Sequence, residues 1–325
     1  MKVHILDDYF DTLRTLPGFA ALDGHDVIVW TDHEADPAAL ARRLDGADAV
    51  VLFRERTPIT AELAGQLRTV KLIAMRGGHP HVDVDALTAA GILFCSHKGE
   101  GGPTVAAAEL TFALILAAAR QLPAQVASAR AGRWQAGVGR TLHGRTLGLL
   151  GYGKLARVVA GYARAFGMNV VVWGSEAGRA RAADAGETVA SSRAGFFAEP
   201  DFVSLHQRLA AETRHTVTAE DLAMMRPDAV LVNTARAELI APGALVTALD
   251  AGRPGGAAFD VFDDEPVTDP ADPVLSHPNV LATPHIGFVT EDELDRQFAD
   301  IYALVNAFAA GTPRAAVNAI PPTPR

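Results

Sequence analysis

The chain has 325 residues, a length typical of about two domains, with 49% hydrophobic and 21% charged residues as in globular proteins with large cores. The net charge of -9 argues against a nucleic-acid partner, because binding to phosphates requires a basic face. The single cysteine, Cys95, excludes an intrachain disulfide and fits a reducing compartment.

Two further features argue against export and against a membrane partner. The N-terminus, MKVHILDDYF, contains acidic residues too early for a secretory signal. The longest apolar stretch, Ala106–Ala119, contains Glu109 and is too short to span a bilayer. We therefore expect a cytoplasmic protein. Cys95 ends an apolar run, which favours a buried side chain over a nucleophile.

Strands and helices alternate along the first hundred residues. Such alternation is typical of a parallel sheet covered by helices on both faces. A helical stretch is also expected after Asp8, through Leu16. The predicted strands are Val3–Leu6, Val27–Trp30, Ala49–Phe53, Leu72–Met75 and Ile92–Cys95, and the predicted helices between them are Pro37–Leu44, Thr60–Leu67 and Val84–Ala90.

The loop Lys98–Pro103, KGEGGP, is rich in glycine and is predicted to be a hinge. It leads into a long apolar helix, Thr104–Arg120, which we expect to pack between domains or against a second subunit. A helix over Pro123–Gly132 and a glycine-containing connection over Trp134–Gly144 follow.

A βαβ unit begins at Thr146. The apolar strand Thr146–Leu150 stops at Gly151-Tyr152-Gly153, a helical pattern runs from Lys154 to Phe166, and Met168–Trp173 is a second strand. In this context the N–H groups at Gly151, Gly153, Lys154 and Leu155 are predicted to hold a pyrophosphate. The third motif position is Ala156, so the match is GxGxxA, and a glycine turn that binds no ligand is the alternative.

Polar residues follow the ends of four later predicted strands. In an open α/β sheet, ligands bind at the carboxyl ends of the strands. The predicted strands are Phe202–Leu205, Ala229–Asn233, Ala257–Val261 and Val280–Ala282, with helices at Ala219–Met225, Pro242–Ala251 and Glu291–Ala310. The polar residues are His206, Thr234-Ala235-Arg236, Asp260 through Glu265, and Thr283-Pro284-His285.

Five blocks carry a resemblance: GYGKLARVVAGYARAFGMNVVVW, SLHQRLAAETR, VNTARAELI, AAFDVFDDEP and LATPHIGF. In these blocks, and over nearly its whole length, the chain resembles the D-isomer-specific 2-hydroxyacid dehydrogenase family, with its phosphoglycerate, glyoxylate/hydroxypyruvate and formate dehydrogenase branches. Five blocks in order are more specific than the glycine motif alone. The resemblance implies an NAD(P)-dependent oxidoreductase that interconverts a D-2-hydroxy acid and its 2-oxo acid.

The resemblance implies roles for three catalytic residues. Arg236 matches the family's substrate-binding arginine, whose guanidinium can grip a carboxylate with two hydrogen bonds. His285 matches the acid/base histidine, and Glu265 matches its partner, which favours the protonated imidazole. The acidic run Asp263, Asp264 and Glu265 suggests a metal site as a rival hypothesis. Hydride transfer requires no metal, so we predict none.

Other family positions imply cofactor contacts and a substrate loop. The cofactor positions are His206, Thr234, Ala235, Asp260 and Gly287, with Asp260 expected to accept a hydrogen bond from the carboxamide. In the loop Arg76-Gly77-Gly78-His79, the family offers backbone N–H groups to the substrate carboxylate.

Three departures from the family pattern leave the choice of ligand open. Where NAD-selective members have Asp, this chain has Ser175-Glu176, and Glu176 would repel a 2′-phosphate, so NAD is favoured over NADP. Arg179 and Arg181 would favour NADP instead. Arg208 replaces a usual Pro, and His79 and His81 stand in an unusual loop, without identifying the substrate.

These observations predict two α/β domains with parallel sheets of the Rossmann-like or flavodoxin-like kind, separated by a cleft. The dinucleotide-binding domain is placed at 99–289, within a discontinuous substrate domain of 1–98 plus 290–325. The family implies a homodimer. The alternatives are a nicotinamide-sensing, corepressor-like binding module and a formate-type dehydrogenase.

Overall fold

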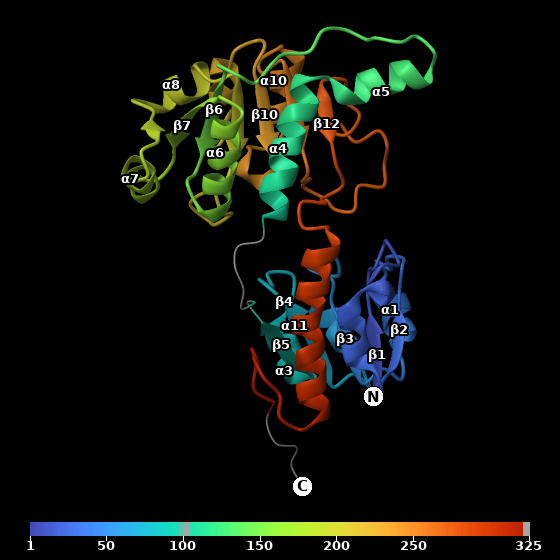
Figure 1. The fold of residues 1–325 in the computed structure, drawn as a ribbon. Coiled ribbons are helices and arrows are strands. Elements are labelled where there is room, and N and C mark those ends of the chain that lie inside the picture. The colour runs from blue at the N-terminus through green and yellow to red at the C-terminus, as the bar shows by residue number, and fades with distance from the viewer. Residues whose placement is uncertain (98, 100–104, 321–325) are drawn as a thin grey trace. The chain divides into compact units, whose positions relative to one another are not determined.

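The computed structural model describes residues 1–97, 99 and 105–320. The chain divides into two compact units, Met1–Gly102 with Thr290–Arg325, and Pro103–Val289. Each unit contains one parallel sheet, so the prediction of two parallel-sheet α/β domains is confirmed (Figure 1). Of the predicted hinge, only Gly99 lies among the described residues.

The first unit has a five-stranded sheet in the order β2-β1-β3-β4-β5. Its interior strands are buried on both faces; Val3, Val50 and Ile73 are fully enclosed. The strands are β1 (Lys2–Ile5), β2 (Asp26–Val29), β3 (Ala49–Val51), β4 (Leu72–Arg76) and β5 (Leu93–His97), and the helices between them are α1 (Pro37–Arg43), α2 (Ala61–Ala64) and α3 (Val84–Ala89).

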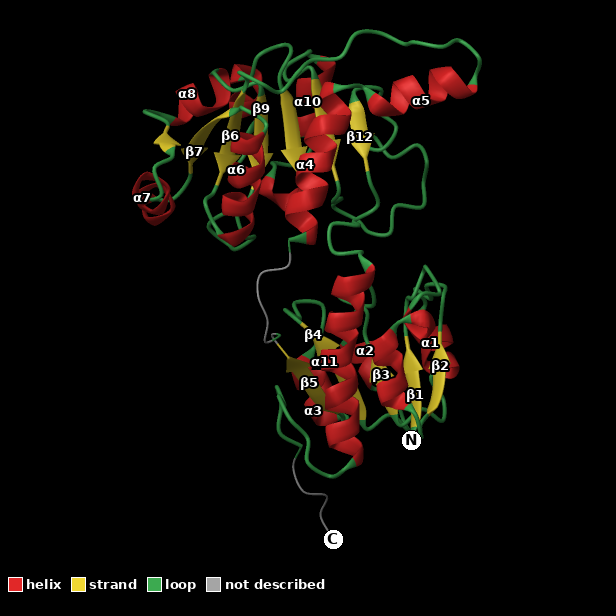
Figure 2. Ribbon diagram, in the orientation of Figure 1, coloured by secondary structure: helices red, strands yellow, loops and turns green. Residues whose placement is uncertain are grey.

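The last long helix, α11 (Glu291–Ala309), belongs to this first unit although it is distant in sequence. It packs along β4 and β5 (Figure 2). The rings of Phe53 and Phe298 lie 4.8 Å apart. The sheet therefore receives one of its covering helices from the chain segment that returns after the second unit.

The helix predicted after Asp8 is wrong. Only two short 3-10 helices form there, η1 (Leu13–Thr15) and η2 (Pro17–Leu22). Asp7 and Asp11 adopt positive φ angles of 62° and 48°, and the Asp8 carboxylate accepts a hydrogen bond from the Leu13 N–H at 3.0 Å. This local side-chain bond offers the backbone an alternative to helix.

The second unit has a seven-stranded sheet in the order β12-β11-β10-β9-β6-β7-β8. All of its strand pairs are parallel, so the carboxyl ends of its strands share one edge. The strands are β6 (Thr146–Leu150), β7 (Asn169–Trp173), β8 (Thr188–Val189), β9 (Phe202–Leu205), β10 (Val230–Asn233), β11 (Gly256–Phe259) and β12 (Val280–Ala282).

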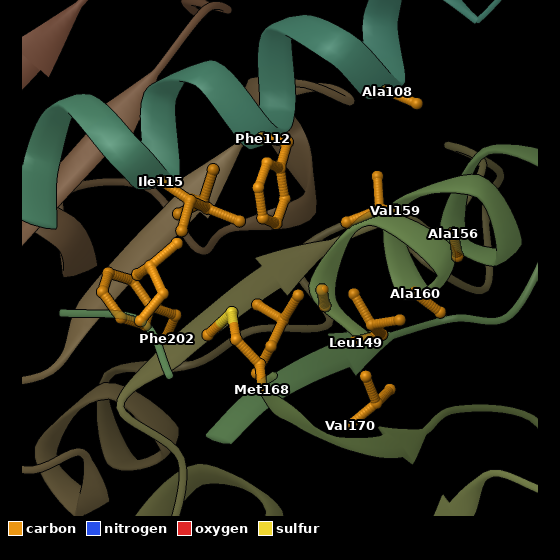
Figure 3. Close-up of a cluster of buried hydrophobic side chains, with 14 of the residues drawn as sticks. Ala108, Phe112, Ile115, Leu149, Ala156, Val159, Ala160, Met168, Val170 and Phe202 are labelled. Atoms are coloured by element: carbon orange, nitrogen blue, oxygen red, sulfur yellow. The ribbon is translucent and has the colours of Figure 1, made fainter. Parts of the chain in front are cut away.

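Helices cover both faces of this sheet. On one face, α4 (Ala106–Ala119) and α6 (Lys154–Ala165) meet through the Phe112 ring, which lies 5.9 Å from Tyr162 (Figure 3). Phe112 and Ile115 are buried in this core, so α4 spends much of its apolar surface inside its own unit. The other helices are α5 (Leu122–Arg130), α7 (Glu176–Asp184), α8 (Arg193–Ala198), α9 (Ala219–Met224), α10 (Ala244–Asp250) and the short η3 (Ala237–Leu239).

Two expectations about surroundings can be compared with the structure. Cys95 is buried, as predicted, and burial raises the pKa of its thiol to about 11. Among the described residues no single helix has the length and apolar composition to cross a membrane. Only α4 and α5 taken together, bent by 61° at the break between them, meet those two criteria.

Candidate functional site

The glycine turn after β6 has a shape that only glycine allows. Gly151 has a φ of +99°, and a Cβ there would lie 3.0 Å from the backbone carbonyl carbon and oxygen of His206. The Gly151 N–H donates to the Trp173 carbonyl at 2.7 Å. Tyr152 is buried, and its hydroxyl donates to Glu187 at 2.9 Å. The turn is thus fixed by contacts with the end of β7, with the backbone that follows β9 and with Glu187.

The next glycine leaves the start of α6 open. Gly153 is the N-cap of α6 and provides no side-chain cap for the first N–H groups of the helix, which begins at Lys154 and Leu155. A Cβ at Gly153 would meet no atom within 4 Å. Uncapped N–H groups and the positive end of the helix dipole together favour an anion at this place.

His206 lines the turn with its backbone. Its imidazole lies 2.9 Å from the hydroxyl of Ser204 in the preceding strand β9, and burial lowers the pKa of the ring to about 4. His206 is therefore neutral near pH 7.

The carboxyl end of β7 holds the residues expected to select the cofactor. Ser175 caps α7 by accepting a hydrogen bond from the Gly178 N–H at 3.2 Å, and Glu176 is exposed at the first position of that helix. The Arg179 guanidinium lies over the Trp173 ring at 4.5 Å and donates to the Gly174 carbonyl at 3.1 Å. The structure thus places an acid and an arginine at this strand end.

The end of β10 is held by a buried amide. Asn233 is fully buried; it accepts from the Ala235 N–H at 3.0 Å and donates to the Arg236 carbonyl at 2.8 Å. The Thr234 hydroxyl lies 2.6 Å from that of Thr111 on α4. These bonds orient Thr234, Ala235 and Arg236 along the sheet edge.

Asp260, after β11, binds the loop that follows β12. Its carboxylate accepts hydrogen bonds from the Thr283 hydroxyl at 2.6 Å and from the N–H groups of Ile286 and Gly287, both at 2.8 Å. A Cβ at Gly287 would lie 3.1 Å from that carboxylate. Burial raises the pKa of Asp260, and these three hydrogen bonds oppose the rise. Asp260 thus holds the loop after β12 through these hydrogen bonds. The resemblance implies a contact of Asp260 with the cofactor carboxamide in addition.

That loop presents His285 to Glu265. His285 has a φ of +53°, a left-handed conformation that is costly for a residue with a Cβ. Its Nδ1 lies 2.5 Å from Glu265 Oε2, and Glu265 Oε1 accepts from the Phe262 N–H at 2.8 Å. Both side chains are partly exposed, so His285 keeps its Nε2 for other partners.

The charges around Glu265 favour its ionised form. Burial raises the pKa of the Glu265 carboxyl, but the hydrogen bond and charge of His285, the Phe262 N–H and the charge of Arg236 together bring it below its ordinary value. The structure therefore brings Glu265, His285 and Arg236 into one electrostatic neighbourhood on adjacent strand ends.

The acidic run beside Glu265 carries the rival hypothesis of a metal site. Among the described residues no group of three or more His, Cys, Asp or Glu side chains has the arrangement of a metal site. Burial, Glu238 and Asp264 raise the pKa of Asp263.

The substrate loop predicted in the first unit follows β4. Gly77 has a φ of +108°, and its N–H donates to the His97 carbonyl at 3.0 Å. Within the described part of the chain, the N–H groups of Gly78 and His79 have no hydrogen-bond acceptor. The Arg76 guanidinium is paired with Asp300 of α11 at 2.8 Å, and a substrate contact of Arg76 stays a prediction.

Three residues of the site escaped the sequence reasoning: Thr111, Asn233 and Glu187. Asn233 could have been found, since a polar residue at the end of an otherwise buried strand requires partners. Thr111 and Glu187 carry no such signal, because their partners Thr234 and Tyr152 are distant in sequence.

Comparisons with known proteins agree with this geometry. The family model for the D-isomer specific 2-hydroxyacid dehydrogenase, NAD binding domain, matches residues 112–287. The chain is 35% identical over 256 residues to a D-3-phosphoglycerate dehydrogenase of Methanocaldococcus jannaschii, covering 78% of this chain and 48% of that protein. It is 31% identical over 301 residues to a glyoxylate reductase of Thermococcus litoralis, covering 88% of each.

A solved structure is also similar over nearly the full length. A phosphoglycerate oxidoreductase from Vibrio cholerae o395 has a TM-score of 0.91 and 44% identity, covering 96% of this chain and 99% of that one. The chain spans about half the length of the curated phosphoglycerate dehydrogenases that it matches first.

The second unit fits NAD, the cofactor of the matched family domain. The open space over Gly153 and the uncapped start of α6 suit a pyrophosphate, and the narrow turn at Gly151 lets the backbone approach it.

Two alanine substitutions separate binding from folding at this turn. Gly153→Ala should leave the melting temperature unchanged and weaken NADH binding about tenfold, because its methyl group enters open space over the helix terminus. Gly151→Ala should lower both the melting temperature and the affinity for NADH, because its Cβ meets the His206 backbone at a positive φ. Calorimetric titration with NADH and thermal melts measure the two effects. Equal NADH affinity in wild type and Gly153→Ala would contradict the assigned cradle.

Proposed function

The chain belongs to the D-isomer-specific 2-hydroxyacid dehydrogenase family, and from that membership we propose that it interconverts a D-2-hydroxy acid and its 2-oxo acid with NAD. Bound NAD supplies or accepts the hydride. The observation that supports the proposal most is the 2.5 Å contact between Glu265 and His285, on a loop held in a strained conformation at the ligand-binding edge of the sheet.

In this proposal His285 is the acid/base group. Its Nδ1 faces Glu265, so Nε2 is the ring nitrogen that donates a proton to the carbonyl oxygen during reduction. In oxidation the neutral Nε2 takes the proton from the hydroxyl group. Glu265 fixes the ring orientation and stabilises the protonated imidazole.

Arg236 is proposed to bind the substrate carboxylate. The Arg236 guanidinium is already oriented by a hydrogen bond from Nη1 to the Ala235 carbonyl at 2.7 Å. A planar guanidinium matches a carboxylate with two parallel hydrogen bonds. In the first unit, the N–H groups of Gly78 and His79 are suited to the same kind of anion.

We propose NAD over NADP as the preferred form. Exposed Glu176 at the end of β7 would repel a 2′-phosphate, and the Arg179 guanidinium is engaged with Trp173 and the Gly174 carbonyl.

The relatives named as phosphoglycerate dehydrogenase and glyoxylate reductase both act on small 2-hydroxy or 2-oxo acids by their names, which is the substrate class proposed here.

The direct test is NADH and NADPH oxidation against a panel of 2-oxo acids, from glyoxylate and hydroxypyruvate to phosphorylated and dicarboxylic members, with formate oxidation alongside. Turnover with NADH should exceed that with NADPH and fall at least a hundredfold in His285→Ala, because the proton donor is lost. His277→Ala is the matched control, since that histidine lies at Asp250 instead. Tight NADH binding without turnover of any acid would favour a sensing module.

We also propose a homodimer formed through α5 and the segment that follows it. Trp134 and Val138 are 76% and 89% exposed, and Leu122 and Val126 on α5 are 47% exposed each. Such a run of exposed apolar side chains is typical of an interface. The predicted interface helix α4, by contrast, is largely buried in its own unit.

Light scattering tests this assembly. The wild type should have about twice the chain mass of 34.2 kDa. Trp134→Asp should lower the measured mass toward that of a single chain, because a charge would enter an apolar interface. Leu275→Asp, at another exposed apolar position in the same unit, should remain dimeric. A monomeric wild type would refute the proposal.

A further inference from the structure

Arg76 connects three separate segments of the first unit. It is the last residue of β4 and directly precedes the loop Gly77-Gly78-His79. Its Nε donates to Asp300 at 2.8 Å, and its Nη1 lies 3.7 Å from Glu293; both acids are on α11. The Arg76 side chain is only 15% exposed. The guanidinium is therefore committed to a helix of its own unit.

Gly99 makes the second contact. It has a φ of +79°, and a Cβ there would lie 2.1 Å from Arg76 Nη2 and 2.6 Å from Cζ. The guanidinium therefore fills the space into which a side chain at Gly99 would project. The Gly99 N–H donates to His97 Nδ1 at 2.9 Å, which fixes that backbone further.

These contacts coincide with both places where the chain passes between the units. The first passage lies at Gly102–Pro103, three residues after Gly99, and the second at Val289–Thr290, just before α11. Glu293 is in the first turn of α11. Arg76 thus contacts the segment that leaves the first unit and the helix that returns to it.

The loop begins directly after Arg76, and its first residue is bonded to β5. Gly77 is pinned by its N–H bond to the His97 carbonyl and by the Ser96 hydroxyl, which donates to the Gly77 carbonyl at 2.9 Å. Beyond Gly77, the N–H groups of Gly78 and His79 have no acceptor among the described residues. Their direction is therefore set by the residues before them.

We propose that Arg76 is a positioning residue that couples the Gly78 and His79 N–H groups to α11 and to the Gly99 segment. It does not touch the substrate; it holds the loop that does, and this inference rests on the proposed function for the meaning of that loop. The fold itself does not depend on it. Buried Glu293 keeps Arg296 and Gln297 as partners when Arg76 is removed.

The test compares Arg76→Met with wild type in amide hydrogen exchange and in kinetics. Exchange of the Gly77 amide should accelerate and the KM for the 2-oxo acid should rise, each about tenfold, since a displaced loop loosens the Gly77 bond to the His97 carbonyl and loses the orientation of the Gly78 and His79 donors. The Kd for NADH should stay unchanged. Arg76→Lys should recover part of the loss, because it keeps the charge beside Asp300 but lacks the flat group that packs on Gly99.

Two further variants keep the test decisive. Arg43→Met breaks a bidentate pair with Asp32 in the same unit, at 2.9 and 2.8 Å, and should change neither readout. Asp300→Asn should change both in the same direction as Arg76→Met, which decides the matter if Arg76→Met fails to fold. Unchanged exchange of the Gly77 amide in both variants would overturn the inference. A wild type without turnover would overturn the proposed function alone, since the exchange result stands by itself.

Discussion

The hydrogen bonds of the Asp260 carboxylate are the constraint on which the candidate site depends. A buried carboxylate is costly unless its oxygens are paired, and here three donors from the segment after β12 supply those partners. In accepting them, Asp260 joins the ends of β11 and β12. It also holds Ile286 and Gly287, which directly follow His285. The left-handed conformation of His285 is therefore maintained by a bond network and not by its own preference.

Parallel sheets explain why the chemistry gathers where it does. Their strands are covered on both faces and leave only the strand ends for polar groups. In the second unit, β6, β9, β10, β11 and β12 all end at one edge, and each end carries a different group: a glycine turn, a neutral histidine, an arginine, an acid and the histidine paired with Glu265. The buried groups Asn233 and Asp260 orient the partly exposed Arg236 and His285. The most buried polar residues thus position the partly exposed residues to which the proposed function assigns the chemistry.

The bounds of a strand could be predicted where a glycine or polar residue directly follows its apolar run. The strands Thr146–Leu150, Phe202–Leu205 and Val280–Ala282 have the predicted bounds, because glycine or polar residues follow each apolar run. The helices α7 and α8 were not predicted, since their short sequences, EAGRARAAD and RAGFFA, carry no apolar stripe long enough to recognise.

The residue types of the candidate site could be predicted from the sequence, but the contacts between these residues could not. Position at strand ends identified Arg236, Glu265 and His285 before any contact was known. The partners of Arg76 could not be inferred, because Asp300 lies 224 positions away and meets it only through packing of α11 on the sheet. Asp260 shows the same limit. Its type was expected, whereas its bonds to the His285 loop depend on the pairing of β11 with β12.

The central claim is that Glu265 and His285 act as one acid/base pair, and the pH dependence of single-turnover NADH oxidation tests it most directly. The His285 charge helps to keep the pKa of Glu265 below its ordinary value. In the wild type, Glu265 should therefore stay ionised and paired with His285 at all pH values near 7. In Glu265→Gln, reduction of the 2-oxo acid should be slower at pH 7 and recover as the pH is lowered, because the medium then supplies the proton that the carboxylate no longer retains on the imidazole. Parallel pH profiles for wild type and variant would contradict the account.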